Sequence, residues 1–222
     1  SIRAWGNHLT SQNIAHGQAD SFAEVEHIMN LQYPREDGGD PMVVALALID
    51  SGDNTDLVYD FCSVNADWAL PSKGSSHPMD THFRLSKVNR TDSKAYGMNL
   101  VMIDTGKYKD MIAGRMRKEN GTGSWMVYLG CDREYAEQVT AEHKVSVKSG
   151  ERTIQKWVLK SSHADNHYLD TEVYAMCAAD VLGARYFHLD DAEVQPRKEA
   201  EKKPDPVYAP EESWMGQHES WI

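Results

Sequence analysis

The sequence predicts an α/β fold in which a mixed sheet is flanked by helices. Residues 42–49 form an apolar run that is too short for an ordinary helix and suits a strand buried on both faces. The run ends in an aspartate, a small-residue turn and a helix cap, an order typical of α/β sheets. A long helix predicted over 166–185 carries an apolar stripe, so we expect it to pack across the sheet with the 42–49 strand at its centre. The stripe consists of Leu169, Val173, Cys177 and Val181.

The composition is that of an ordinary globular protein with an acidic balance. The chain has 222 residues, of which 41% are hydrophobic and 26% charged, and this suits one domain with appendages. The formal net charge of -11 argues against a nucleic-acid binder that works by bulk attraction to phosphate. It leaves open an enzyme that meets nucleic acid through metal ions and a local basic rim. No apolar run approaches the length that spans a bilayer, and no signal peptide opens the chain.

The first half of the chain is expected to alternate short strands and helices. The predicted elements are strands at 2–5 and 13–15, a helix after Ser21, the 42–49 strand, a helix after Asn54 that buries Leu57, Val58, Phe61 and Cys62, and a strand at 68–71. Residues 75–95 show little apolar periodicity, and we interpret them either as a mobile loop that can act as a lid or as a disordered surface excursion.

The second half continues the same alternation and ends in a polar tail. The predicted elements are a strand at 98–104, a helix at 105–117, a strand at 125–129, a helix at 133–139, a hairpin pairing 145–149 with 153–159, and the helix at 166–185. From there the chain is rich in Glu, Lys and Pro. We therefore divide it into a domain over residues 1–188 and a tail over 189–222. Cys62, Cys131 and Cys177 form no CxxC pair, so we expect reduced core cysteines of a cytosolic protein.

Two acids are candidates for chemistry. Asp50 ends the 42–49 strand, and ligands of open α/β sheets bind along the edge where the strands end. Asp170 falls in the first turn of the last helix, on the side near its apolar stripe. Each has a structural alternative, because a strand-end Asp can cap a turn and an acid in a first helical turn is favoured by the helix dipole. Facing each other, the two carboxylates can hold one or two Mg²⁺ or Mn²⁺ ions.

Several short blocks resemble the nuclease domain of lambda-type phage terminase large subunits. They occur in the family's order and span most of residues 40–185. The blocks are Ile49-Asp50-Ser51-Gly52 followed by Leu57-Val58-Tyr59; Leu70-Pro71-Ser72-Lys73-Gly74; Asp104-Thr105 with Lys109-Asp110-Met111-Ile112 and Arg115; Val139-Thr140-Ala141-Glu142; and Asn166-His167-Tyr168-Leu169-Asp170 with Val173-Tyr174-Ala175.

This resemblance implies a ribonuclease-H-like fold that cuts concatemeric viral DNA with two Mg²⁺ or Mn²⁺ ions during genome packaging. It makes Asp50 the second acid and Asp170 the third acid of the metal site. The implied partners are double-stranded viral DNA, the terminase small subunit, the portal protein and an ATPase domain upstream in the same polypeptide. No membrane partner is implied, and the implied location is the cytoplasm of the infected bacterial host.

The sequence departs from the family at its start. The family's first acid lies on the first strand of the sheet, upstream of every block matched here. No GxxxxGK[ST] sequence occurs, so the chain has no P-loop of its own. We therefore expect a nuclease domain that is incomplete at its N-terminus, and a fragment that cuts DNA poorly or not at all.

Basic residues near these blocks are candidates for DNA contacts. Lys73 lies in a matched block, and Lys109 and Arg115 follow Asp104 on the predicted helix. Lys156 and Lys160 flank the hairpin that leads to Asp170, and they can line a DNA groove. Glu142 also lies in a matched block, and we interpret it as a structural acid rather than a metal ligand.

Two alternatives come from other classes. The Asp50-Ser51-Gly52 turn is similar to the phosphate loop of actin-like and sugar-kinase ATPases, although that fold needs a second such loop and a longer chain. The other alternative is a ribonuclease-H-like module that grips DNA or the portal without cutting. Assays of nucleotide binding and of metal-dependent nicking separate the three.

Overall fold

The computed structural model describes residues 1–150 and 152–187, and within them the predicted α/β class is confirmed. The helices are α1 (Phe22–Met29), α2 (Thr55–Val64), α3 (Thr105–Met116), α4 (Arg133–Val139), α5 (His167–Val181) and the short 3-10 helices η1 (Asn7–Leu9) and η2 (Ala184–Tyr186). None of these described helices is long and apolar enough to cross a membrane. The predicted tail over 189–222 lies outside the described residues.

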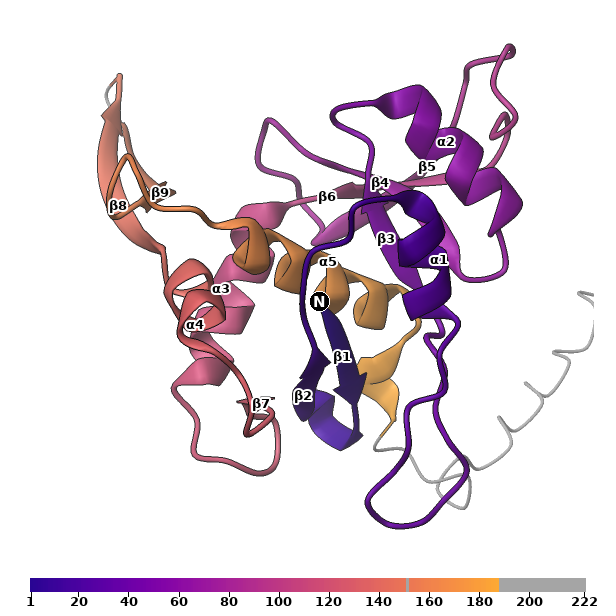
Figure 1. Ribbon diagram of the computed structural model, residues 1–222. Coiled ribbons are helices and arrows are strands. Elements are labelled where there is room, and N and C mark those ends of the chain that lie inside the picture. Colours follow the sequence, from indigo (N-terminus) through magenta and orange to yellow (C-terminus); the bar gives the residue numbers. More distant parts are fainter. Residues whose placement is uncertain (151, 188–222) are drawn as a thin grey trace, which may run out of the picture. The chain divides into compact units, whose positions relative to one another are not determined.

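A four-stranded mixed sheet occupies the upper part of Figure 1. Its strands lie in the order β3 (Ala47–Asp50), β4 (Ala69–Gly74), β6 (Asn99–Ile103) and β5 (Phe83–Lys87). The first three strands are parallel, and β5 runs antiparallel to β6. Because parallel strands end at the same edge, β3 brings Asp50 to that edge, opposite Ser72 of β4.

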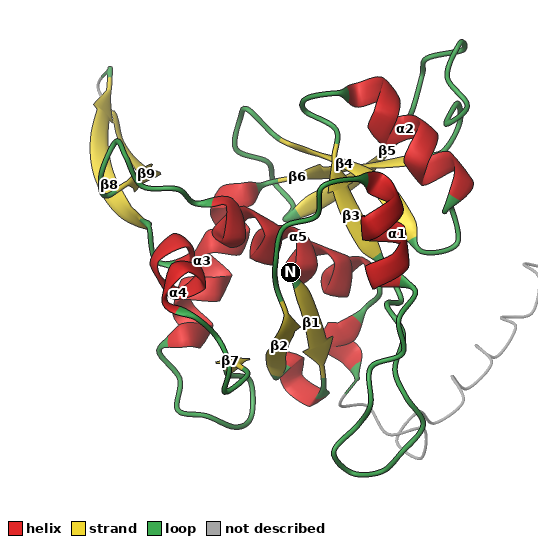
Figure 2. Cartoon of the chain, viewed as in Figure 1, coloured by secondary structure: helices red, strands yellow, loops and turns green. Residues whose placement is uncertain are grey.

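Helices cover both faces of this sheet (Figure 2). Successive residues of a strand point to opposite faces, so a single strand can bury side chains on both. Leu48 packs into a core shared with α3 and α5, including Tyr108 and Val173. Its neighbours Ala47 and Ile49 contact the cluster formed by α1, α2 and the start of β4. The sheet is therefore the middle of three layers.

The remaining strands form a second sheet and a hairpin. The second sheet consists of β1 (Ile2–Trp5), β2 (Ser11–Ala15) and β7 (Trp125–Val127), with β1 antiparallel and β7 parallel to β2. The hairpin pairs β8 (Glu142–Ser149) with β9 (Arg152–Leu159) and projects away from the helices in Figure 1. Helix α5 contacts both β1 and β3, so it connects the two sheets.

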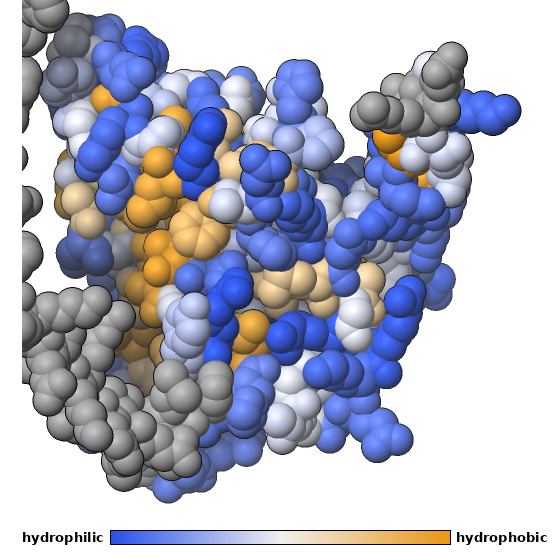
Figure 3. All heavy atoms as spheres, turned by 180° about the vertical axis from the view of Figure 1, so that it is seen from behind, coloured by the Kyte–Doolittle hydropathy of each residue, from blue (hydrophilic) through white to orange (hydrophobic). Residues whose placement is uncertain are grey.

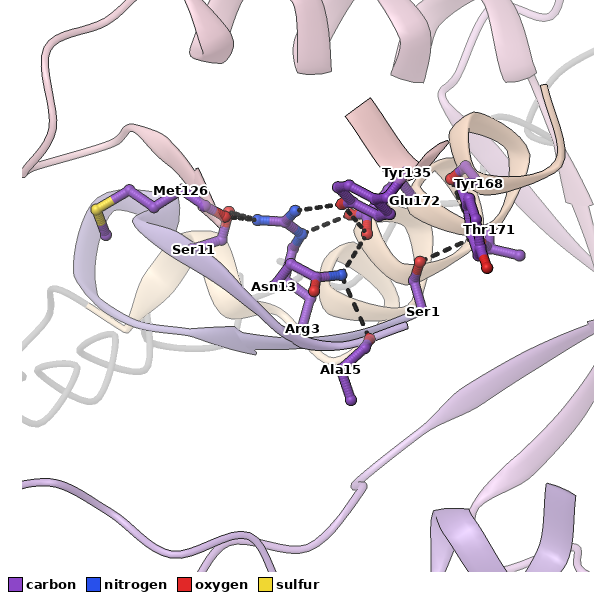
Figure 4. A network of polar contacts seen from close by, with 10 residues as sticks. All are labelled: Ser1, Arg3, Ser11, Asn13, Ala15, Met126, Tyr135, Tyr168, Thr171 and Glu172. Carbon is purple, nitrogen blue, oxygen red and sulfur yellow. Dashed lines mark hydrogen bonds and ion pairs between the residues drawn. The ribbon is translucent and has the colours of Figure 1, made fainter. Parts of the chain in front are cut away.

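A buried polar network fixes α5 to the second sheet (Figure 4). Arg3 donates from Nε to Glu172 Oε2 at 2.6 Å, and neither side chain is exposed to solvent. Glu172 Oε1 accepts from Asn13 Nδ2 and from the Tyr135 hydroxyl, each at 2.8 Å. The Arg3 guanidinium also lies 4.0 Å from the centre of the Trp125 ring. Glu172 can be buried as a charge because it is paired and hydrogen bonded in this way.

The central position predicted for the 42–49 strand is wrong. Strand β3 begins only at Ala47 and stands at one end of the four-stranded order. Before it, Met42 makes an isolated bridge with Tyr33, and Val43 is 60% exposed. The apolar run lines a groove shared with β1 instead of lying between two strands.

Two further details differ from the sequence prediction. The loop expected over 75–95 contains β5, which pairs along its whole length with β6. None of the residues of β5 is fully buried, and Leu85 is 48% exposed, so this strand lacks the buried apolar face by which strands are predicted. Leu57, expected in the core, is 61% exposed, whereas Val58 and Phe61 on the same helix are buried as predicted.

Candidate functional site

Asp50 forms a tight turn at the carboxyl edge of the four-stranded sheet. Its Oδ1 accepts the backbone N–H of Gly52 at 2.9 Å, so it caps the turn. A Cβ added at Gly52 would lie 3.3 Å from this same oxygen, which explains why the turn carries glycine. Asp50 is an exposed residue. It therefore holds its own turn and still faces solvent.

Asp170 lies in the first turn of α5, as predicted. Its side chain is 41% exposed, and Oδ1 lies 3.2 Å from Lys109 Nζ. Oδ2 accepts from Asn166 Nδ2 at 3.3 Å. Burial raises the pKa of Asp170 above its ordinary value, against the opposing effect of the Lys109 charge. The carboxylate is thus held by two neighbours while part of it stays open to water.

Lys109 and Glu142 complete this cluster. Lys109 Nζ donates to Glu142 Oε1 at 2.6 Å, and Asn166 Nδ2 donates to the same oxygen at 2.7 Å. The Glu142 side chain is only 6% exposed. One ammonium group therefore lies between two carboxylates, Glu142 and Asp170. We call Lys109, Glu142, Asp170 and Asn166 the open cluster.

Tyr174 connects Asp170 with Asp50. It lies one helical turn after Asp170 on α5, and both Tyr174 and Asp50 line the groove beside β3. Burial raises the pKa of the Tyr174 phenol, and the charges of Asp50 and Asp170 raise it further. Both carboxylates thus act on the same phenol, which remains a protonated hydrogen-bond donor.

Asp104 is a third acid at a strand end, and it is committed to structure. It follows β6, caps α3 by accepting the backbone N–H of Lys107 at 3.1 Å, and accepts that of Met79 at 2.9 Å. These two bonds fix the loop that leads to β5. Asp104 therefore positions backbone, and Asp50 and Asp170 remain the acids that face the site.

The oxygen donors at this edge fit the chemistry of Mg²⁺ and Mn²⁺, which prefer carboxylate ligands. Their number does not complete a site. Among residues 1–150 and 152–187, no group of three His, Cys, Asp or Glu side chains is arranged to hold a metal ion. The carboxylates of Asp50 and Asp170 are therefore of the right chemistry for these ions, but the described residues do not form a metal centre.

The basic residues singled out from the sequence lie in different surroundings. Arg115 donates from Nη1 to the carbonyl oxygens of Leu9 and Gly123, which connects α3 to the second sheet. Lys109 belongs to the open cluster. Lys73 is half-buried in β4, whereas Lys156 and Lys160 are exposed on or just after β9. The structure does not bring the five together in one patch.

Two grooves flank these acids. The first, about 930 Å³, lies between β1 and residues 42–50, and we call it the strand groove. The second, about 620 Å³, lies between α3 and the β8–β9 hairpin, and we call it the hairpin groove. Apolar side chains gather in a band on the face shown in Figure 3, and the large apolar residues that are both exposed and part of the strand groove are Met42, Val43, Leu182 and Phe187.

Sequence reasoning missed Tyr174 and Asn166 as members of the site, although both lay in a matched block. Their spacing was the available signal, because Asn166, Asp170 and Tyr174 are four residues apart and so share one face of a helix. Lys109 was singled out as a contact to DNA. Its pairing with Glu142 depends on the fold, since 33 residues separate them.

Comparison with known protein families gives one result. The family model for the terminase large subunit gpA endonuclease domain matches residues 1–192. No curated protein and no solved structure matches the chain.

Proposed function

The chain belongs to the family of terminase large subunit gpA endonuclease domains, and from this premise we propose that it hydrolyses phosphodiester bonds of concatemeric viral DNA with two divalent metal ions during genome packaging. One observation carries the proposal. Asp50 ends β3 at the carboxyl edge of the sheet and lines the strand groove with Tyr174, and Asp170 lies one helical turn before Tyr174 on α5. Ligands of open α/β sheets bind at such an edge.

In this function some of the chain's own residues would hold the metal ions, and others orient the carboxylates that bind them. Asp50 and Asp170 would hold Mg²⁺ or Mn²⁺ through carboxylate oxygens. Lys109 and Asn166 fix the Asp170 carboxylate, and the Gly52 N–H fixes that of Asp50. Bound ions would polarise the phosphate and stabilise the attacking and leaving oxygens. The Asp50 side chain already accepts the backbone N–H of Gly52 in its turn. This favours the nuclease over a phosphate loop, in which backbone amides bind the nucleotide.

The strand groove supports a ribonuclease-H-like sheet with one more strand. Among the described strands, β1 and β3 each stand at one end of their sheet, and both line this groove. A strand between them would join the two sheets through β1 and β3. In the proposed arrangement this strand carries the first acid of the metal site and completes the coordination that Asp50 and Asp170 begin.

Contacts to other molecules follow from the family. We propose double-stranded viral DNA as the substrate, contacted by Lys73, Lys156 and Lys160. The terminase small subunit, the portal protein and an upstream ATPase domain are the proposed partners. The proposed place of action is the cytoplasm of the infected bacterial host.

Plasmid nicking in Mn²⁺ tests the proposal. This chain should nick slowly or not at all, and a longer form that adds the proposed acid-bearing strand upstream of Ser1 should nick readily. In the longer form, Asp50→Ala and Asp170→Ala should each abolish nicking. The matched controls are Asp53→Ala and Asp165→Ala, exposed acids close in sequence to the two candidates.

Two results would contradict the proposal. If the longer form is as inactive as this chain while it binds DNA, the domain is a non-catalytic module. If this chain nicks as fast as the longer form, its own residues already complete the site, and the additional acid is not needed.

A further inference from the structure

The hairpin groove is open to solvent and separate from the strand groove. Its floor is the second half of α3, and its wall is the β8–β9 hairpin. At about 620 Å³ it has the size of sites that hold small molecules. Its polar and aromatic lining residues are Lys109, Asp110, Arg117, Thr140, Glu142, His143, Lys144, Trp157 and Lys160.

The lining carries a local excess of positive charge. Lys109, Arg117, Lys144 and Lys160 face two carboxylates, Asp110 and Glu142. On a chain with a formal net charge of -11, such a surface is a specific place for an anion. Arg117 and Lys160 are exposed residues, so their charges are accessible to a ligand.

One carboxylate orients an aromatic ring and a cation in the groove. Asp110 Oδ1 accepts from Trp157 Nε1 at 3.1 Å, and both Asp110 oxygens lie 2.7 Å from Lys144 Nζ. The indole is half-buried and fixed at its polar end. Aromatic faces held beside cations are the usual means by which proteins bind unpaired nucleotides, with bases stacked and phosphates paired.

The groove leads to the open cluster. Lys109 and Glu142 line it, and Lys109 also contacts Asp170. A nucleotide strand in the groove would therefore lie next to Lys109, which contacts Asp170 of the proposed metal site. We propose that the hairpin groove binds unpaired nucleotides of the DNA strand next to the cleaved phosphate, with a base on Trp157 and phosphates at Arg117, Lys144 and Lys160. This inference rests on the proposed function, and it makes single-stranded or frayed DNA the form that the groove recognises.

Fluorescence anisotropy with a labelled single-stranded oligonucleotide tests it, at low salt and in EDTA so that no cleavage occurs. Trp157→Ala should weaken binding about fivefold or more, since one stacked base contributes about 1–3 kcal/mol. Trp157→Phe keeps an aromatic ring and should retain most of the affinity. Lys160→Ala should reduce the slope of log affinity against log salt by about 0.7, the value for one phosphate contact of a single strand.

The controls separate this inference from folding and from the proposed function. Lys148→Ala removes an exposed cation of the same hairpin outside the groove and should leave binding unchanged. Circular dichroism should show that each variant is folded. Equal binding by Trp157→Ala and the parent, or tighter binding of a blunt duplex than of the single strand, would overturn the inference. A protein that binds the single strand through Trp157 but never nicks would retain this inference and lose the proposed function.

Discussion

Two acids of helix α5, Asp170 and Glu172, lie two residues apart in opposite surroundings. Glu172 is paired with Arg3 at 2.6 Å, and neither side chain is exposed. Asp170 is paired with Lys109 at 3.2 Å, and its side chain is 41% exposed. Two residues correspond to about half a turn of helix, so the acids face different sides.

This difference distinguishes an acid that anchors a helix, Glu172, from an acid that is accessible to solvent and ligands, Asp170. Removing one partner of a buried pair strongly destabilises the fold, because the other charge is then left buried without compensation. A half-exposed acid is compensated by water and can exchange its partner for another cation. Pairing alone therefore does not distinguish an anchoring acid from an acid that is accessible to a ligand, whereas the exposure of the paired side chain does.

The largest expected effect compares Glu172→Ala with Asp170→Ala. Glu172→Ala leaves Arg3 buried and unpaired, and it should lower the free energy of unfolding by about 3–5 kcal/mol. Asp170→Ala should lower it by less than about 1 kcal/mol, because water screens the pair. Urea unfolding at neutral pH measures both. Arg133→Ala, which removes an exposed pair with Glu137, is the reference for a surface change. Equal losses at the two acids would end the distinction between a sealed and an open pair.

An intermediate effect on stability is expected when the cation of each pair, Lys109 or Arg3, is replaced by methionine. Lys109→Met leaves Glu142 and Asp170 without their shared ammonium and should cost about 1–3 kcal/mol. A divalent cation can replace that charge, so Mn²⁺ should raise the melting temperature of Lys109→Met more than that of the parent. Arg3→Met should be destabilised more strongly and gain nothing from Mn²⁺. Rescue of both variants to the same extent would show that the Arg3 pair is also accessible to ions.

A smaller effect concerns acid stability. Burial alone would raise the pKa of Glu172, but the Arg3 charge and the bonds from Tyr135 and Asn13 hold the pKa below its ordinary value of 4.5. A carboxyl with a lowered pKa in the folded state stabilises the fold above its unfolded pKa. That contribution is lost as the pH falls through the folded pKa. Urea unfolding below about pH 5 should therefore show a shallower pH dependence for Glu172→Gln than for the parent.

The smallest expected effect is a difference in thiol reactivity. Burial raises the pKa of Cys177 on α5 to about 12, so this thiol should stay unreactive in the folded protein. Cys131 is less buried and should react with a thiol reagent first. Asp170→Ala should leave Cys177 protected, whereas Glu172→Ala should speed its labelling. Fast labelling in both variants would show that α5 is held less firmly than its buried face implies.

The sequence predicted those parts of the fold that local patterns determine. The helix at 133–139 has the predicted bounds, and the hairpin around Gly150 is present because a turn residue separates two runs of strand formers. Strand β5 could not be recognised in this way, since its order comes from pairing with β6.

The site could be predicted only in part, for the same physical reason. Asp170 was singled out by its position in a helical turn, and the structure places it in the first turn of α5. Glu172 was not singled out, because its role depends on Arg3, which is 169 residues away in the sequence. A local sequence pattern cannot predict which of two neighbouring acids will be buried in a pair with a residue that is distant in the sequence.

The pairing of Arg3 with Glu172 also determines when folding can finish. A strand at the start of the chain is fixed to a helix near residue 172, so the second sheet lacks its anchor until nearly all the described residues have been synthesised. Contacts of such high sequence separation slow folding, because a long loop must close before they contribute. During synthesis Arg3 precedes Glu172 by 169 residues and remains without its partner while the β3–β6 segments and the hairpin form. Docking of α5 is therefore the step that completes the domain, and the interval before it is when the chain is most open to aggregation.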